Sequence, residues 1–114
     1  MRQISILSPS GDLGISDVAR MSVAVDRLIV ASENVAIIID WAAVDFLHPL
    51  AIGILLERKA AIERGGGSFV FARMSKFVRA IFWQYGMDEI FEIYSSIEEA
   101  LESMSEEWSD DAKV

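Results

Sequence analysis

The chain has 114 residues and no cysteine, so it is long enough for one domain and can form neither a disulfide nor a thiol nucleophile. Its formal net charge of −8 repels nucleic-acid phosphates and anionic lipid, which makes a protein partner with a basic face more plausible than nucleic acid or a membrane. The absence of cysteine favours the reducing cytoplasm. The longest apolar runs, such as residues 35–39, are far shorter than the roughly 20 residues that span a bilayer, so we expect no transmembrane segment.

The first thirty residues predict two short strands followed by a helix. Residues 4–7 and 13–15 are strand-like, and the turn-forming segment Ser-Pro-Ser-Gly-Asp between them indicates a hairpin. Ser16 can cap a helix that ends near Ser32. Apolar residues recur along that helix at three- and four-residue steps and give it one apolar face: Val18, Met21, Val25, Leu28 and Ile29.

The middle of the chain predicts a central strand, a loop and a second helix. Residues 35–40 read Val-Ala-Ile-Ile-Ile-Asp, a β-branched run typical of a strand that is covered on both faces. After a loop at residues 41–48, Pro49 suits the first position of a helix. We expect the three glycines at 65–67 to end this helix, because a phosphate-binding loop would lead from a strand into a helix instead.

The last third of the chain predicts two further strands, at residues 68–72 and 90–94, each followed by a helix. Ser75 can cap the first helix, with Gly86 at its exit, and Ser96 with Glu99 has the spacing of a capping box for the second. The inward residues of the first helix should be Val78, Ile81, Phe82 and Tyr85, and those of the second Ile97, Ala100, Leu101, Met104 and Trp108. We expect one domain over residues 1–105 and a frayed acidic tail over 106–114.

Strands that alternate with helices predict an α/β fold with right-handed crossovers. We expect a mixed, mostly parallel sheet of about five strands with about four helices, in which the N-terminal hairpin supplies an antiparallel edge. Binding sites in such sheets lie beyond the carboxyl ends of the central strands, and residues 40–50 occupy that place.

Residues 40–55 read Asp-Trp-Ala-Ala-Val-Asp-Phe-Leu-His-Pro-Leu-Ala-Ile-Gly-Ile-Leu. Without a gap, this stretch resembles the Asp-Leu-x-x-Val-x-x-Ile-Asp-Ser-Ser-Gly-Leu-x-x-Leu pattern of the STAS family, the anti-sigma-factor-antagonist-like binding modules. The segments at 66–72, 85–91 and 96–101 also fit that family in order and spacing. The resemblance implies a single-domain STAS-like fold and a regulatory role exerted by binding another protein.

The chain departs from the STAS pattern at the helix entry. In the family, a partner kinase phosphorylates the second hydroxyl residue of an Asp-Ser-Ser/Thr-Gly element, and this weakens binding. Those four positions are His48, Pro49, Leu50 and Ala51 here, so Pro49 and Leu50 form a degenerate phosphosite without a hydroxyl. The resemblance therefore implies a member that the usual phosphate cannot switch off.

We expect the protein to bind an anti-sigma kinase or a related signalling protein through the segment around residues 41–50. Its apolar side chains can form an exposed contact patch, although they can equally well cover the end of the sheet. A short helix cannot bury all of Phe77, Phe82, Trp83 and Tyr85, so at least Trp83 should be exposed. The predicted partner contacts are Trp41, Asp45, Phe46, His48, Leu50, Ile54 and Trp83.

Two other classes of function are weighed against this one. The chain could be a scaffolding STAS subunit, either of a lipid-transport ATPase of the ABC transporter type or of a stress-sensing assembly. A homo-oligomer is one possible form. An enzyme is disfavoured, because the only histidine, His48, is more simply a hydrogen-bonded residue at a helix entry. Asp40 and Asp45 give no sign of a shared proton or a metal, so no catalytic residue, metal or cofactor is predicted.

Overall fold

The protein has an α/β fold in which strands and helices alternate along most of the chain, which confirms the predicted fold class. The computed structural model describes residues 3–112, with side chains for residues 3–104. The strands are β1 (Ile4–Leu7), β2 (Ser10–Leu13), β3 (Ala36–Asp40), β4 (Ala43–Leu47), β5 (Ser68–Ala72) and β6 (Ile93–Tyr94). The helices are α1 (Ile15–Ala31), the short 3-10 helix η1 (Pro49–Ala51), α2 (Ile52–Arg64), α3 (Lys76–Gln84) and α4 (Ile97–Ala112).

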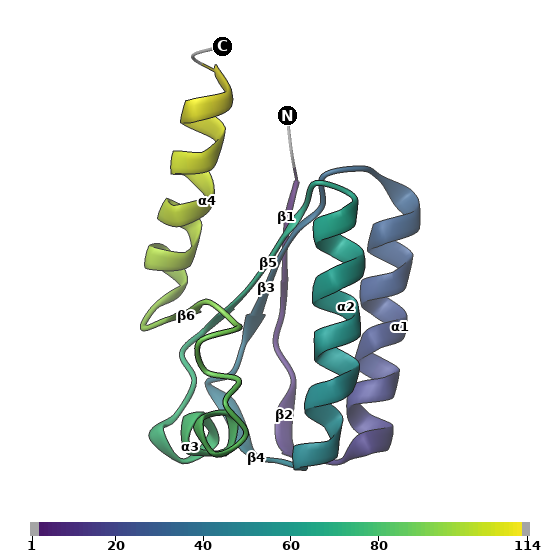
Figure 1. The fold of residues 1–114 in the computed structure, drawn as a ribbon, viewed down its shortest axis with the longest axis vertical. Helices are drawn as coiled ribbons and strands as arrows, with labels where there is room; N and C mark the ends of the chain where they lie inside the picture. Colours follow the sequence, from purple (N-terminus) through teal and green to yellow (C-terminus); the bar gives the residue numbers. More distant parts are fainter. Residues whose placement is uncertain (1–2, 113–114) are drawn as a thin grey trace.

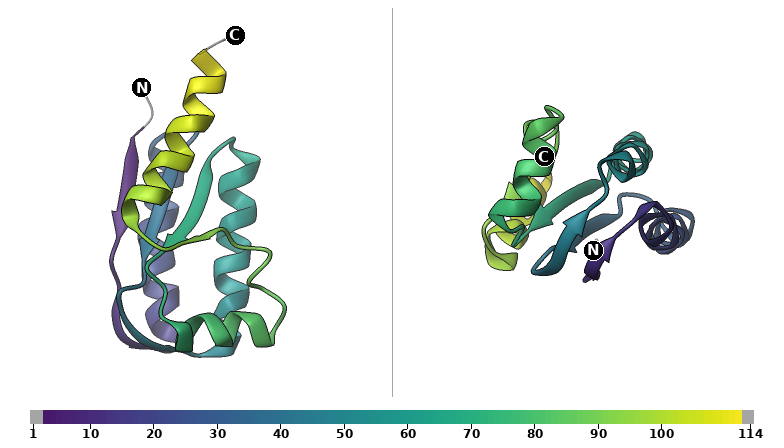
Figure 2. Two further views of the ribbon diagram at one scale, coloured as in Figure 1. Left: turned by 90° about the vertical axis from the view of Figure 1, so that its left-hand side faces the viewer. Right: turned by 90° about the horizontal axis from the view of Figure 1, so that it is seen from below.

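Two sheets, both parallel, form the middle layer. A four-stranded sheet has the order β1-β3-β5-β6, and β2 pairs with β4 in a smaller one. Helices α1 and α2 cover one face of the larger sheet, α4 covers the other, and α3 lies at the end where β3 and β5 finish (Figure 1; Figure 2). The carboxyl ends of the central strands therefore meet β4, η1 and α3.

Strand β3 is the centre of the core, as its sequence predicts. All five of its residues are buried. Because side chains alternate along a strand, Ile37 and Ile39 pack in the cluster beneath α1 and α2, while Ala36 and Ile38 pack in the cluster beneath α4. Helices on both faces explain why this strand is a continuous apolar run.

The predicted N-terminal hairpin is wrong. Strand β1 pairs with β3 and β2 pairs with β4, both in parallel, so β1 and β2 run one after the other in the same direction. The link at Ser8 and Pro9 carries the chain from one sheet to the other without reversing it. Gly11 has a φ of +81° and a register shift follows it, which marks a bulge in β2. The described residues therefore have no antiparallel edge.

The predicted loop at residues 41–48 is also largely a strand. The Trp41 N–H donates to the Ala72 carbonyl at 2.9 Å, and the Val44 N–H donates to the Trp41 carbonyl at 3.0 Å, so the chain makes one tight turn after β3. Strand β4 then pairs with β2. The backbone of β4 is satisfied by a segment about thirty residues earlier in the chain, which local sequence patterns do not reveal.

Two element boundaries differ from the prediction. Helix α1 begins at Ile15, and the Asp17 carboxylate accepts a hydrogen bond from the Gly14 N–H at 2.8 Å, so Ser16 lies inside the helix and does not cap it. The last strand is only Ile93–Tyr94, because residues 87–91 form turns in which the Ile90 and Phe91 N–H groups both donate to the Met87 carbonyl.

The remaining helix predictions are mostly confirmed. The Ser75 hydroxyl accepts from the Val78 N–H and the Ser96 hydroxyl from the Glu99 N–H, both at 3.1 Å, so both helices start as predicted. Helix α2 ends before the three glycines. The inward face of α4 packs as expected through Ile97, Ala100, Leu101 and Met104. Trp108 and the acidic side chains from 106 onward lie outside the described side chains, and the domain boundary after residue 105 stays a prediction.

Candidate functional site

Exposed apolar side chains gather at one end of the molecule. We call this region the α3 end; it comprises β4, η1, the first turn of α2, α3 and residues 85–91, in the lower part of Figure 1. Six of the ten large apolar side chains that are exposed in the described part of the chain belong to it: Phe46, Leu50, Phe77, Trp83, Tyr85 and Ile90. Such a concentration is typical of a surface that contacts another molecule.

A shallow apolar groove lies at the centre of the α3 end. It encloses about 530 Å³ between the start of α2 and the segment that follows α3, and no charged side chain lines it. Leu50 is 71% exposed at its edge, and open space surrounds the position where Gly53 would carry a Cβ atom. Its lining residues are Pro49, Leu50, Ile52, Gly53, Leu56, Tyr85 and Met87.

The predicted contact Trp41 does not belong to this surface. Its side chain is fully buried, with its ring 5.1 Å from that of Phe71 and 5.7 Å from that of Phe82, both edge-on. Its assignment as a direct partner contact is therefore wrong, because the chain is still bonded to β5 at residue 41 and directs the indole into the core. The other interpretation, that these residues cover the end of the sheet, is confirmed for Trp41 and for Leu47.

The other predicted contacts take several positions. Asp45 and Phe46 are exposed on β4, and the Phe46 ring lies 6.4 Å from that of Phe77 on α3. Ile54 is half-buried against the main core and does not line the groove. Trp83 is exposed as predicted, at 69%. The structure thus leaves Phe46, Leu50 and Trp83 as the apolar members of the predicted set that are accessible at the α3 end.

Tyr85 is a residue that the sequence assigned to the core and the structure assigns to the groove. Helix α3 ends at Gln84, so Tyr85 lies at its C-cap with its ring more than half exposed. The inward prediction is wrong because it continued the helical spacing one residue too far. The left-handed Gly86, with a φ of +70°, marks the true exit.

His48 is the N-cap of η1, the short helix that borders the groove. Its Nδ1 accepts a hydrogen bond from the Leu50 N–H at 3.2 Å, and its backbone N–H donates to the Leu13 carbonyl at 2.9 Å. The imidazole therefore caps η1 in the way that a serine or aspartate side chain would. This confirms the interpretation of His48 as a hydrogen-bonded helix-entry residue.

An ion pair between Asp40 and Arg73 lies behind this surface, and the sequence did not predict it. The Arg73 Nε and a terminal guanidinium nitrogen donate to the two Asp40 carboxylate oxygens at 3.0 and 2.7 Å. The carboxylate is nearly buried and also accepts from the Ala42 N–H at 3.1 Å, while the guanidinium is about half exposed. The Arg73 hydrogen bonds, more than any other contact, lower the pKa of Asp40, against the opposing effect of burial.

The register of the strands brings this pair together, and the local sequence pattern does not show that register. Asp40 is opposite Ala72 in the β3–β5 ladder, so Arg73 is the first residue beyond β5 at the same end. Arg73 has a φ of +59°, a left-handed conformation that is uncommon for a residue with a side chain. The pair explains why Asp40 and Asp45 do not act together: Asp40 is held by its arginine, and Asp45 is exposed on β4.

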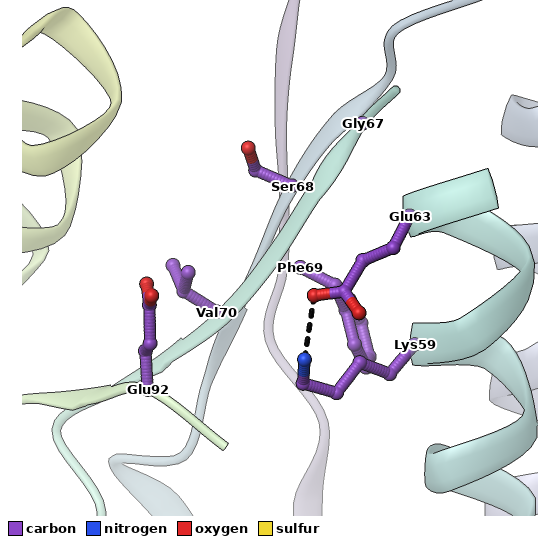
Figure 3. A pocket seen from close by; sticks show the side chains of 7 residues that line it. All are labelled: Lys59, Glu63, Gly67, Ser68, Phe69, Val70 and Glu92. Carbon is purple, nitrogen blue, oxygen red and sulfur yellow. Dashed lines mark hydrogen bonds and ion pairs between the residues drawn. The ribbon is translucent and has the colours of Figure 1, made fainter. Parts of the chain in front are cut away.

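A second hollow, beside the edge of β5, is a poorer candidate (Figure 3). It encloses only about 100 Å³ between α2 and the segments around β5 and β6. Lys59 is the cation that lines this hollow, and its charge is already neutralised because its Nζ lies 2.5 Å from a carboxylate oxygen of Glu63. Glu92 adds a further negative charge to the lining. This hollow therefore offers an anionic ligand no free cation.

In the described residues, no group of three or more His, Cys, Asp or Glu side chains is arranged to hold a metal ion. No helix in that same part of the chain is both long and apolar enough to cross a membrane.

Comparison with known proteins agrees with this architecture. The family profile described as the STAS domain matches residues 2–100. The chain is 30% identical over 98 residues to the anti-sigma-F factor antagonist RsfB of Mycobacterium tuberculosis, which covers 86% of this chain and 79% of that protein.

Solved structures share the fold. The Bacillus anti-sigma factor antagonist SpoIIAA in its unphosphorylated form superposes with a TM-score of 0.76 at 20% identity, over 89% of this chain and 88% of that one. The STAS domain of a SulP transporter from Vibrio cholerae has a TM-score of 0.75 at 15% identity, over 94% and 84% of the two chains. At these identities the likeness concerns the fold alone.

Proposed function

This chain belongs to the STAS domain family, and we propose that it acts as a non-enzymatic binding module of the anti-sigma factor antagonist kind. The observation that carries the proposal is the uncharged groove at the start of α2, with Leu50 71% exposed at its edge. The resemblance to the STAS pattern assigns the family's phosphorylated residue to this position. The proposed partner is an anti-sigma factor kinase or a related signalling protein. The relation to RsfB, itself an anti-sigma-F factor antagonist, supports this choice over a scaffolding role.

The proposed module lacks the usual means of release. SpoIIAA has been solved in a phosphorylated form as well, whereas residues 48–51 of this chain carry no hydroxyl. A phosphate would add about 1.5 to 2 negative charges at this surface. Leu50 instead presents an apolar side chain, and His48 keeps the helix start capped without a hydroxyl. We infer that the surface stays competent for binding at all times.

The groove can supply enough apolar area for a specific contact. Burying a leucine-sized side chain stabilises a complex by about 1.5 to 3 kcal/mol, and a few such residues near the centre of an interface carry most of its affinity. Leu50, Tyr85 and Met87 line one continuous hollow and can act together in this way. Phe46 and Phe77 extend the apolar surface along β4 and α3.

The proposal is tested by titrating the full chain with purified anti-sigma factor kinases from the organism that encodes it, using calorimetry. Leu50→Asp should weaken binding about a hundredfold, because an unpaired carboxylate would be buried in the groove. The matched control is Val30→Asp, the same change at an 88% exposed position on α1, away from the groove, and it should leave the affinity unchanged.

Equal affinities for the two variants would rule out the groove as the binding site. Mass spectrometry of the peptides after incubation with kinase and ATP tests the missing switch separately, and we expect no phosphate on residues 48–51. A phosphate elsewhere that abolishes binding would contradict permanent competence. A stable homo-oligomer that does not bind any kinase would favour the scaffolding role.

A further inference from the structure

Charge is segregated among the helices of this acidic protein. Helices α1 and α2 each carry side chains of both signs. The described side chains of α4 include three glutamates, Glu98, Glu99 and Glu102, and no cation. Helix α3 has the opposite charge composition, because it carries the cations Lys76 and Arg79 and no carboxylate. The net charge of −8 therefore conceals a locally basic helix at the α3 end.

The two cations of α3 have no electrostatic partner within the described part of the protein. Neither lies within ion-pair distance of a carboxylate there, which is also true of the exposed Arg27 and Arg64, whereas Arg20, Arg58, Lys59 and Arg73 each form an ion pair. Both lie at the start of the helix, where the macrodipole is positive and a cation is unfavourable. This placement weakens the isolated helix, and such departures from local rules are expected at functional sites.

These cations share one face of α3 with an exposed aromatic ring. Lys76, Arg79 and Trp83 follow one another at steps of three and four residues, which places them on the same side of the helix. With Ala80 and Asp88 they line a hollow of about 290 Å³. The Trp83 ring is 69% exposed beside it. Asp88 is the one carboxylate that lines this hollow, and it forms no ion pair with either cation.

We propose that this face of α3 receives an acidic segment of the protein partner, with carboxylates of the segment on Lys76 and Arg79 and an apolar side chain against Trp83. The inference rests on the proposed function and names the chemistry of the partner at the same end of the molecule. Charge complementarity supports an acidic segment, because two unpaired cations flank an apolar ring. The net charge of the chain predicts a basic partner face, whereas helix α3 itself carries only positive charges.

Two other occupants have weaker support. An anionic membrane would attract α3 through the same residues, but the net charge of −8 repels such a surface from the rest of the molecule. A second copy could present the acidic face of α4, but two copies that each carry this charge repel one another. Both occupants are distinguished by the experiment that follows.

The test uses the ¹⁵N-labelled full chain and a synthetic twelve-residue probe in which glutamate and aspartate flank leucine and phenylalanine. We expect the probe to shift the amide signals of residues 76–84, and its glutamine and asparagine analogue to leave them unchanged. Lys76→Glu with Arg79→Glu should weaken binding about tenfold. The matched control reverses the exposed Arg27 and Arg64, so both double variants change the net charge from −8 to −12.

Each other outcome overturns the inference. Equal binding of the amide analogue, equal loss in both double variants, or no shift in residues 76–84 would show that α3 does not recognise carboxylates. Binding to phosphatidylglycerol vesicles without binding to the peptide would identify a membrane surface. A dimer in sedimentation that the Lys76→Glu, Arg79→Glu variant abolishes would identify a second copy.

The kinase titration separates this inference from the proposed function. If Leu50→Asp abolishes kinase binding and the α3 double variant binds the kinase normally, the proposed function is supported and binding of an acidic segment to α3 is excluded. If the kinase binds and neither variant alters its affinity, neither the groove nor α3 is the binding surface; if the original chain binds no kinase, the proposed function itself fails. A tenfold loss in the double variant, with no loss in the Arg27 and Arg64 control, supports both.

Discussion

The molecule holds two groups of aromatic side chains that meet on the same short helix. Trp41, Phe71, Phe82 and Phe91 are buried, and their ring centroids lie 4.8 to 5.8 Å apart in stacked and edge-on pairs. The second group is exposed at the α3 end: Phe46, Phe77, Trp83 and Tyr85. Helix α3 contributes Phe82 to the first group and Phe77 and Trp83 to the second.

The two groups differ in burial, and this difference assigns similar aromatic side chains to two roles, stability and binding. The buried rings lie where β3, β5 and α3 converge, and their contacts hold these elements together. The exposed rings have little effect on the packing of the core and leave apolar area in contact with water, which is unfavourable unless a partner covers it. Substitutions in the first group should therefore alter stability, and substitutions in the second should alter binding.

The largest expected effect is at Trp41. Trp41→Ala should lower the free energy of unfolding by about 3 to 5 kcal/mol, because it removes the largest fully buried side chain and leaves a cavity between Phe71 and Phe82. Trp41→Phe should cost clearly less, since the indole Nε1 has no hydrogen-bond partner to lose. Urea denaturation followed by circular dichroism measures both values.

The matched substitution in the exposed group is Trp83→Ala. It removes the same kind of side chain from an exposed position on α3 and should change the free energy of unfolding by less than about 0.5 kcal/mol. Comparable losses at positions 41 and 83 would contradict the division between a structural and a binding group.

The second largest effect is expected at the ion pair behind the site. Asp40→Asn should lower the free energy of unfolding by about 1.5 kcal/mol, because the carboxylate loses its charged hydrogen bonds with Arg73. The Asp40 pKa is below its usual value of 3.8 in the folded chain, so its stabilising contribution is complete above that pH. As the pH falls through the lowered pKa, protonation removes it.

Denaturation at a series of pH values from 7 to 2 measures this contribution. The gap in stability between the original chain and Asp40→Asn should be constant above about pH 5 and should narrow towards pH 2. A gap that persists unchanged at pH 2 would show that the substitution acts through shape and not through charge. Asp45→Asn, at an exposed carboxylate without an ion pair among the described residues, provides the control.

Much of the fold follows from local patterns. The run at 35–40, the caps Ser75 and Ser96, and the glycines after α2 each fix an element by residues close in sequence, and each is confirmed. The pairing of β2 with β4 could not be predicted this way, because each strand is short and its partner is about thirty residues away. The hairpin was predicted in error because a turn-like composition does not specify the direction of the chain after the turn.

The candidate site was predicted less completely than the fold. The helix entry was located correctly, because Pro49 suits the first position of a helix and His48 caps it. Exposure was predicted correctly for Trp83 but not for Trp41 and Tyr85. Each of these two residues lies one residue beyond the end of an element, where a small change in the path of the chain reverses the direction of a side chain. The ion pair between Asp40 and Arg73 depends on the register of two parallel strands, which only the assembled sheet defines.

The smallest expected effect on stability is at Leu50, the residue that represents the exposed group most directly. Leu50→Ser should change the free energy of unfolding by less than about 0.5 kcal/mol, because the side chain is mostly exposed and its N–H would keep the bond to His48. Binding of the kinase should nevertheless weaken about tenfold, since one apolar contact is lost from the groove. The serine also introduces a hydroxyl at the position that the proposal assigns to the family's phosphate acceptor. If the kinase transfers phosphate to it and the phosphorylated chain no longer binds, the surface has retained its response to charge and has lost only the acceptor. A phosphorylated chain that binds as well as the unphosphorylated one would mean that Leu50 lies outside the interface, and the division between the two aromatic groups would then no longer locate the binding surface.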